Sequence, residues 1–160
     1  MKNLTFSKFF IVILPRFSMI YFLVCIVIAM FLYKGGIYHM ILENGASQCP
    51  GTSCTDEGHR TIGYLFSQNF LSDLGRTMTH GGHINYHSSF IFNMALTFGG
   101  VTYILFYYFL KNLFHNQILA KLGSLLGIFG GISFIGVAFT PADLYLDAHI
   151  IANEWIFRFF

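Results

Sequence analysis

Charged residues are scarce in this 160-residue sequence: Asp, Glu, Lys and Arg together make up 10% of it, whereas a soluble domain carries about 25%. This composition excludes an intrinsically disordered chain, which would be rich in charge and poor in aromatic residues. Nine Lys and Arg against seven Asp and Glu leave no basic surplus, so we expect no binding to nucleic acid. Three cysteines are too few for a disulfide-built mini-protein.

Hydrophobic residues are abundant instead, at 55% of the chain with 20 phenylalanines. They gather in long uncharged runs, and a helix needs about 20 apolar residues to cross a bilayer. We therefore predict an all-α integral membrane protein, a polytopic helical bundle forming a single transmembrane domain over residues 1–160. The predicted spans are residues 12–33, 86–110, 118–139 and 141–160.

Two local patterns refine the last two predicted spans. Gly123, Gly127 and Gly131 recur every fourth residue, a spacing that lets membrane helices approach closely, although glycine is also simply tolerated in lipid. The stretch 140–143, Thr-Pro-Ala-Asp, is typical of a helix start. The helix that it predicts continues to the last residue, so we favour a fragment of a longer chain.

Basic residues predict which side of the membrane each end faces. Five positive charges and no acidic residue lie at or near the N-terminal end of the first span and the connection between the second and third spans, namely Lys2, Lys8, Arg16, Lys111 and Lys121. By the positive-inside rule the N-terminus is cytoplasmic. The sequence therefore predicts a multi-pass protein of the cell (cytoplasmic) membrane, with loop 34–85 and the turn in the 140s outside.

The predicted external loop, residues 34–85, is too long for a mere connection. Cys49 and Cys54 flank a Pro-Gly turn there, which favours a disulfide in an oxidising compartment, with two free thiols as the alternative. Further on, apolar residues at helical spacing predict an interfacial amphipathic helix over about 61–74.

Polar residues from three segments are expected to converge on the outer end of the bundle. Ionisable groups in a bilayer usually point into the bundle or a wet cavity, because exposure to lipid is costly. The sequence thus predicts an outward-facing pocket lined by Asn69, Ser72, Asp73, His83, His87, Asn93, Asp143, Asp147 and His149. Glu154 and Arg158 are one turn apart and are predicted to pair with each other.

Three histidines precede the second span. His83 and His87 are four residues apart and share a helix face, and His80 lies just before them, so a zinc-type metal site is a further hypothesis. The sequence contains no HExxH motif and no signature of a soluble hydrolase, nucleotide-binding or dinucleotide-binding enzyme.

Two blocks carry a resemblance. Asn69-Phe70-Leu71-Ser72-Asp73-Leu74-Gly75, with Ile91-Phe92-Asn93 after it, and Pro141…Asp143…His149 are similar to the bacterial membrane family known as domain of unknown function 998. They resemble DRAM-type membrane proteins more faintly. The resemblance implies a bundle of about six spans and makes Ser72, Asp73, Gly75, Asp143 and His149 the matching residues. That family's function is itself uncharacterised.

The leading functional hypothesis is non-catalytic. The outer pocket would bind or sense a lipid, ion or small molecule, or the protein would support a membrane partner or form a homo-oligomer. The alternative is a membrane-embedded hydrolase or transferase, with or without a metal, that acts on a lipid or envelope substrate and uses Asp73, Asp143, Asp147 or His149 as the catalytic group. A secondary transporter is a weaker alternative, because no inverted repeat is visible.

Overall fold

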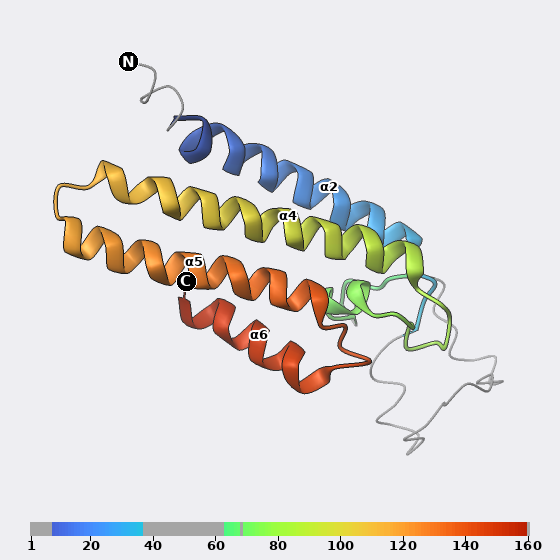
Figure 1. Cartoon of the computed structure of the whole chain (residues 1–160). Coiled ribbons are helices and arrows are strands. Elements are labelled where there is room, and N and C mark those ends of the chain that lie inside the picture. The colour runs from blue at the N-terminus through green and yellow to red at the C-terminus, as the bar shows by residue number, and fades with distance from the viewer. Residues whose placement is uncertain (1–7, 37–62, 68, 160) are drawn as a thin grey trace.

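The computed structural model describes residues 8–36, 63–67 and 69–159, and this part of the chain is all-helical with no strands (Figure 1). A π-helical turn, η1 (Phe9–Ile13), leads directly into α2 (Leu14–Leu32). A short 3-10 turn, η2 (Leu71–Gly75), precedes α4 (Tyr86–Leu110), which ends in the 3-10 turn η3 (Lys111–Leu113). The chain continues with α5 (Gln117–Phe139) and α6 (Leu146–Phe159).

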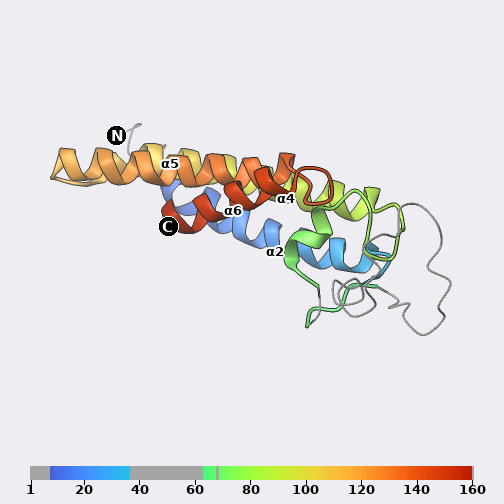
Figure 2. The same ribbon diagram turned by 90° about the horizontal axis from the view of Figure 1, so that it is seen from below.

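The three long helices lie side by side with α4 in the middle, and α6 runs back along α5 (Figures 1 and 2). Successive helices run in opposite directions. At one end, the ring of Phe10 stacks on that of Phe109 with centroids 4.5 Å apart. At the other end, Asp143 contacts Thr77. The helices therefore run alternately in opposite directions along the bundle (Figure 1).

Three helices are long and apolar enough to cross a membrane: Phe9–Leu32, Tyr86–Leu113 and Gln117–Phe139. They correspond to the first three predicted spans. Many large apolar side chains on them are exposed, which is expected of surfaces that face lipid rather than water. The helical membrane class is supported to this extent.

The fourth predicted span is not confirmed. Helix α6 has 14 residues in the described part of the chain, so it is about 21 Å long, against a bilayer core of about 30 Å. It also begins later than predicted, at Leu146. Pro141 instead accepts backbone hydrogen bonds from Leu144 and Tyr145 in a turn that precedes the helix.

The predicted interfacial helix over 61–74 is also wrong where the structure describes it. Residues 63–67 form bends and turns, and only η2 is helical. The reason is competition from side chains. The Asn69 Oδ1 atom accepts a hydrogen bond from the Leu65 N–H at 3.0 Å, and Asp73 Oδ2 accepts one from the Phe70 N–H at 2.9 Å. The predicted Cys49–Cys54 disulfide lies outside the described residues.

Glycines bring α4 and α5 together over part of their length. A Cβ placed on Gly131 would lie 2.8 Å from the Gly100 carbonyl oxygen, and one on Gly127 would lie 2.3 Å from the Tyr107 ring. The predicted close approach is therefore confirmed at Gly127 and Gly131. It is wrong at Gly123, where a Cβ would have no neighbour within 4 Å.

Candidate functional site

The segment before α4 folds back as a small hairpin, with Met78 bridged to Ile84. The Thr79 N–H donates to the His83 carbonyl at 2.9 Å, and Gly82 takes a positive φ of 76° at the tip of the turn, a conformation that favours glycine. This turn directs the side chain of His80 back toward η2. There it meets Asp73.

The Asp73 carboxylate is the centre of a closed hydrogen-bond network. Its Oδ1 atom lies 3.0 Å from His80 Nε2, and Oδ2 accepts from the Phe70 N–H at 2.9 Å and from Asn69 Nδ2 at 3.5 Å. The side chains of His80 and Asp73 are only 2% and 5% exposed. A carboxylate buried to this degree needs such partners, because burying an unpaired charge is very costly.

Asn69 links this network to the end of α2. Its Nδ2 atom donates to the Gly36 carbonyl at 2.7 Å, while the Tyr64 hydroxyl donates to the Asn69 carbonyl at 3.3 Å. Burial, and then the negative charge of Asp73, raise the pKa of Tyr64 above its usual value of 10. Tyr64 therefore remains a neutral hydrogen-bond donor at neutral pH.

Asn85 and Ser88 clasp η2 onto the start of α4. The Asn85 Nδ2 atom donates to the carbonyls of Leu74 and Arg76 at 3.1 and 3.0 Å, and Ser88 Oγ donates to the Leu74 carbonyl at 3.3 Å. Because Gly75 has no side chain, η2 can lie close to α4: a Cβ on Gly75 would be only 2.9 Å from Asn93 Oδ1. We call Asn69, Asp73, His80, Asn85 and Ser88 the polar cap.

Asp143 ties the α5–α6 turn to the segment that follows η2. Its carboxylate accepts hydrogen bonds from the Thr77 hydroxyl, from the Thr77 N–H at 3.1 Å and from the Met78 N–H at 3.0 Å. Burial alone would raise the pKa of Asp143, but these hydrogen bonds outweigh it and hold that pKa below its usual 3.8. The sequence predicted that Asp143 lies in the first turn of the last helix. Asp143 instead holds the α5–α6 turn against Thr77 and Met78.

The residues predicted for α6 divide into two faces. His149 is buried, and its Nδ1 lies 2.7 Å from the Thr140 carbonyl oxygen, so the ring fixes the end of α5. Asp147 is exposed. Arg158 pairs with Glu154 at 3.3 Å, which confirms the predicted i,i+4 pair, and both side chains are more than half exposed.

The residues predicted to line an outer pocket take part in several separate contacts in the described part of the chain. The structure brings Asn69 and Asp73 into one closed network, places Asn93 behind Gly75 and engages Asp143 and His149 in separate contacts. Ser72 is half-buried within η2, and His83, His87 and Asp147 are exposed. Most of the buried polar side chains at this end hydrogen-bond to one another or to the backbone, although the buried Asn85 Oδ1 atom has no hydrogen-bond partner among the described residues.

The three histidines do not come together as a metal site either. Among the described residues there is no group of three or more His, Cys, Asp or Glu side chains placed to hold a metal ion. His80 is engaged with Asp73, while His83 and His87 are exposed.

Sequence reasoning missed three members of these contacts. Asn85 and Ser88 carry no signal beyond being polar residues at the edge of an apolar run. Thr77 binds a residue 66 positions away in the chain, a distance at which local patterns predict nothing. His80 was identified only as a metal ligand, not as the partner of Asp73.

Comparison with known proteins gives no family for this chain: no protein family, no curated protein and no solved structure matches it. The resemblance to domain of unknown function 998 stays a prediction.

Proposed function

We propose that the chain is a non-catalytic, multi-pass protein of the cytoplasmic membrane that assembles with a membrane partner through the outward face of α6. The observation that carries this proposal is the position of Asp147, Glu154 and Arg158. At 100° per residue they lie within about 40° of one another on the helix. His149, Ala152 and Ile156, which are buried or half-buried, lie about 140–200° away from Asp147 on the opposite face.

The charged pair of this face lies at a depth where lipid contact is costly. Phe159 stacks on Phe129, with ring centroids 5.6 Å apart, so α6 extends back to the middle of α5 (Figure 1). With α5 crossing the bilayer, Glu154 and Arg158 lie near its mid-plane. A charged residue at the centre of a membrane helix costs about 2.5–3.5 kcal/mol on insertion scales.

A neighbouring protein helix removes this cost by covering the pair. A second copy of the chain is one suitable partner, because in a parallel pair of α6 helices Glu154 of each copy lies one turn from Arg158 of the other. Trp155 also lies on the exposed side, and the Arg158 guanidinium carbon is 5.1 Å from the centre of its ring. Aromatic and arginine side chains of this kind are enriched at protein interfaces.

The assembly is tested by removing the charged pair as a unit. Glu154→Gln combined with Arg158→Gln keeps polar side chains of similar size but removes both charges. We expect the purified double variant to have a smaller mass than the wild type in mild detergent, measured by light scattering on a sizing column. The matched control is Lys34→Gln, an exposed charge outside α6. An equal mass for all three proteins contradicts assembly through this face.

The second candidate, a membrane hydrolase or transferase, has one observation in its favour. A buried carboxylate 3.0 Å from an imidazole is the arrangement that orients a general base. Against this, Asp73 and His80 are nearly inaccessible, and Oδ2 of Asp73 is occupied by the backbone. For an enzyme, Asp73→Asn would abolish turnover of a lipid or envelope substrate in protein that remains folded.

A further inference from the structure

The outward face of α6 has a polar centre and apolar edges. Four residues form one line along this face at spacings of four, three and four, and we call them the α6 seam: Asp147, Ile151, Glu154 and Arg158. At 100° per residue the seam is about 60° wide. Phe157, which is 78% exposed, lies on one side of the seam, and Trp155, which is 41% exposed, lies on the other. Charged residues of membrane helices usually face protein or water, so this arrangement indicates a protein contact.

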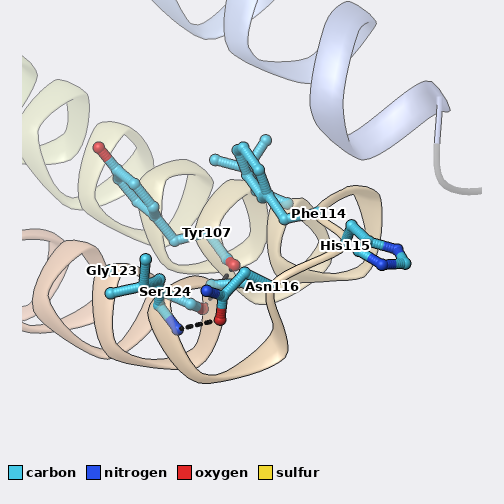
Figure 3. Close-up of a pocket in the computed structure, with 9 residues that line it drawn as sticks. Tyr107, Phe114, His115, Asn116, Gly123 and Ser124 are labelled. Atoms are coloured by element: carbon cyan, nitrogen blue, oxygen red, sulfur yellow. Dashed lines mark hydrogen bonds between the residues drawn. The ribbon is translucent and has the colours of Figure 1, made fainter.

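The opposite end of the bundle has an uncovered surface of another kind. A cavity of about 420 Å³ lies where α4 turns into α5, with Tyr107 and Phe114 opposite Gly123 and Ser124 (Figure 3). It forms an open groove that is lined mostly by apolar side chains. Lipid chains are as apolar as leucine, so they can cover this groove without a partner protein. They cannot cover the charged α6 seam in that way.

The membrane fixes how two copies of the chain can bring their seams together. Copies with the same sequence insert in the same orientation, so their α6 helices run parallel about a two-fold axis along the membrane normal. Spacings of three and four residues are typical of a left-handed pair of helices that cross at about 20°. Each seam residue then lies at the same depth as its counterpart in the other copy.

Charge favours a second copy over a partner helix that carries one sign of charge. Glu154 and Arg158 pair within one chain at 3.3 Å, and both side chains are more than half exposed. In a parallel pair each Glu154 also lies one turn from Arg158 of the other copy, so two acids and two bases alternate. A helix with only acidic or only basic residues would attract one member of the pair and repel the other. Asp147 lies in the first turn of α6, at the outer end, where salt and water screen repulsion between copies.

We propose that the protein forms a parallel homodimer through the α6 seam, with the Glu154–Arg158 pairs of the two copies joined in one four-charge cluster. This inference rests on the proposed function and names the partner in that assembly. Ile151 of each copy packs against its counterpart above the cluster, and Trp155 and Phe157 cover its sides.

The test uses two variants that each carry one sign of charge in the cluster. Glu154→Lys makes both positions of the pair positive, and Arg158→Glu makes both negative. Each variant alone places four like charges together, so we expect its dimer to be weakened about tenfold or more. Dimer is measured against the wild type by light scattering on a sizing column in mild detergent. Co-expressed with different affinity tags, the two variants are expected to co-purify as a complex of two chains.

The matched control exchanges the two charges within one chain. Glu154→Arg combined with Arg158→Glu keeps one acid and one base per chain and is expected to form as much dimer as the wild type. Equal dimer in every variant, or single variants that remain apart when co-expressed, overturns the proposal.

A monomeric wild type separates this inference from the proposed function. If the wild type is a monomer and a photoreactive residue at position 151 links it to a different protein, the homodimer is overturned while assembly through α6 stands. A monomer that gives only lipid adducts from that position contradicts both.

Discussion

The two ends of the bundle differ in how they use polar residues. At the polar cap, Asp73 and Asn85 are buried and bonded to the backbone of a short folded-back segment. At the α4–α5 turn, Lys111 and Lys121 follow residues that line an open apolar groove. Many polar groups occur at the first end and few at the second.

A cluster of polar residues in a membrane protein therefore does not by itself make a binding site. Buried polar groups find hydrogen-bond partners, and a segment rich in them uses the partners that the neighbouring backbone offers. Space for a ligand is left where small residues such as Gly123 face an apolar gap with nothing to fill it. The two ends are therefore expected to respond in opposite ways to substitution.

The largest effect is expected from Asp73→Ala. It removes the acceptor of the Phe70 N–H and the carboxylate oxygen that lies 3.0 Å from His80 Nε2, and the loss of a hydrogen-bond partner costs about 1–3 kcal/mol for each buried polar group. The free energy of unfolding in detergent, measured by urea titration, should fall by that amount. Asp147→Ala is the control: Asp147 is exposed, so a change within about 0.5 kcal/mol is expected. An equal decrease in the free energy of unfolding for both variants would show that the polar cap does not stabilise the fold.

Replacing one glycine at each end of the bundle by alanine is expected to change stability in opposite directions. Gly75→Ala places a Cβ 2.9 Å from Asn93 Oδ1 and from Phe92 Cδ1, so a loss of about 1–3 kcal/mol is expected in the same titration. Gly123→Ala meets nothing within 4 Å and removes a helix-breaking residue, so a gain of up to about 1 kcal/mol is expected. A loss at Gly123 would mean that the groove is closed.

A smaller, pH-dependent effect is expected from Asp143→Asn. Because the folded-state pKa of Asp143 lies below the usual 3.8, its carboxylate contributes stability above pH 3.8 and loses it as the pH falls through the folded-state value. At pH 7 the variant should be less stable by about 1 kcal/mol. Unfolding titrations below pH 3.8 should show the two proteins converging. A gap that widens on acidification would have the wrong sign.

The smallest effect is expected from His83→Ala and His87→Ala. Both side chains are exposed, so each variant should change the free energy of unfolding by less than about 0.5 kcal/mol. Metal content of the purified protein, measured by mass spectrometry, should not change either. Loss of bound zinc in either variant would restore the histidine metal site.

The sequence predicts this fold where the signal is local. Apolar runs give the three long helices, and the spacing of Glu154 and Arg158 gives their pair, since both depend on neighbours along one helix. The predicted start of α6 is wrong because Asp143 accepts a hydrogen bond from Thr77, which is far away in the sequence.

The candidate site is predicted less well than the fold. The sequence singles out Asp73 as a candidate, but its partner His80 reaches it only through the turn at residues 79–83. The groove beside Gly123 has no signal of its own, because the same glycine spacing predicts close packing at all three positions. Whether a Cβ has room there depends on where Tyr107 points, which is a property of the packed pair of helices.

The outward face of α6 is tested most directly by photo-crosslinking in native membranes. In one protein a photoreactive amino acid replaces Ile151, which is 55% exposed and lies beside Asp147, Glu154 and Arg158 on the outward face of α6. In a second protein it replaces Val24, which is 51% exposed on α2. We expect a protein adduct from position 151, with twice the chain mass for a second copy, and only lipid adducts from position 24. Lipid adducts alone at position 151 would contradict assembly through α6.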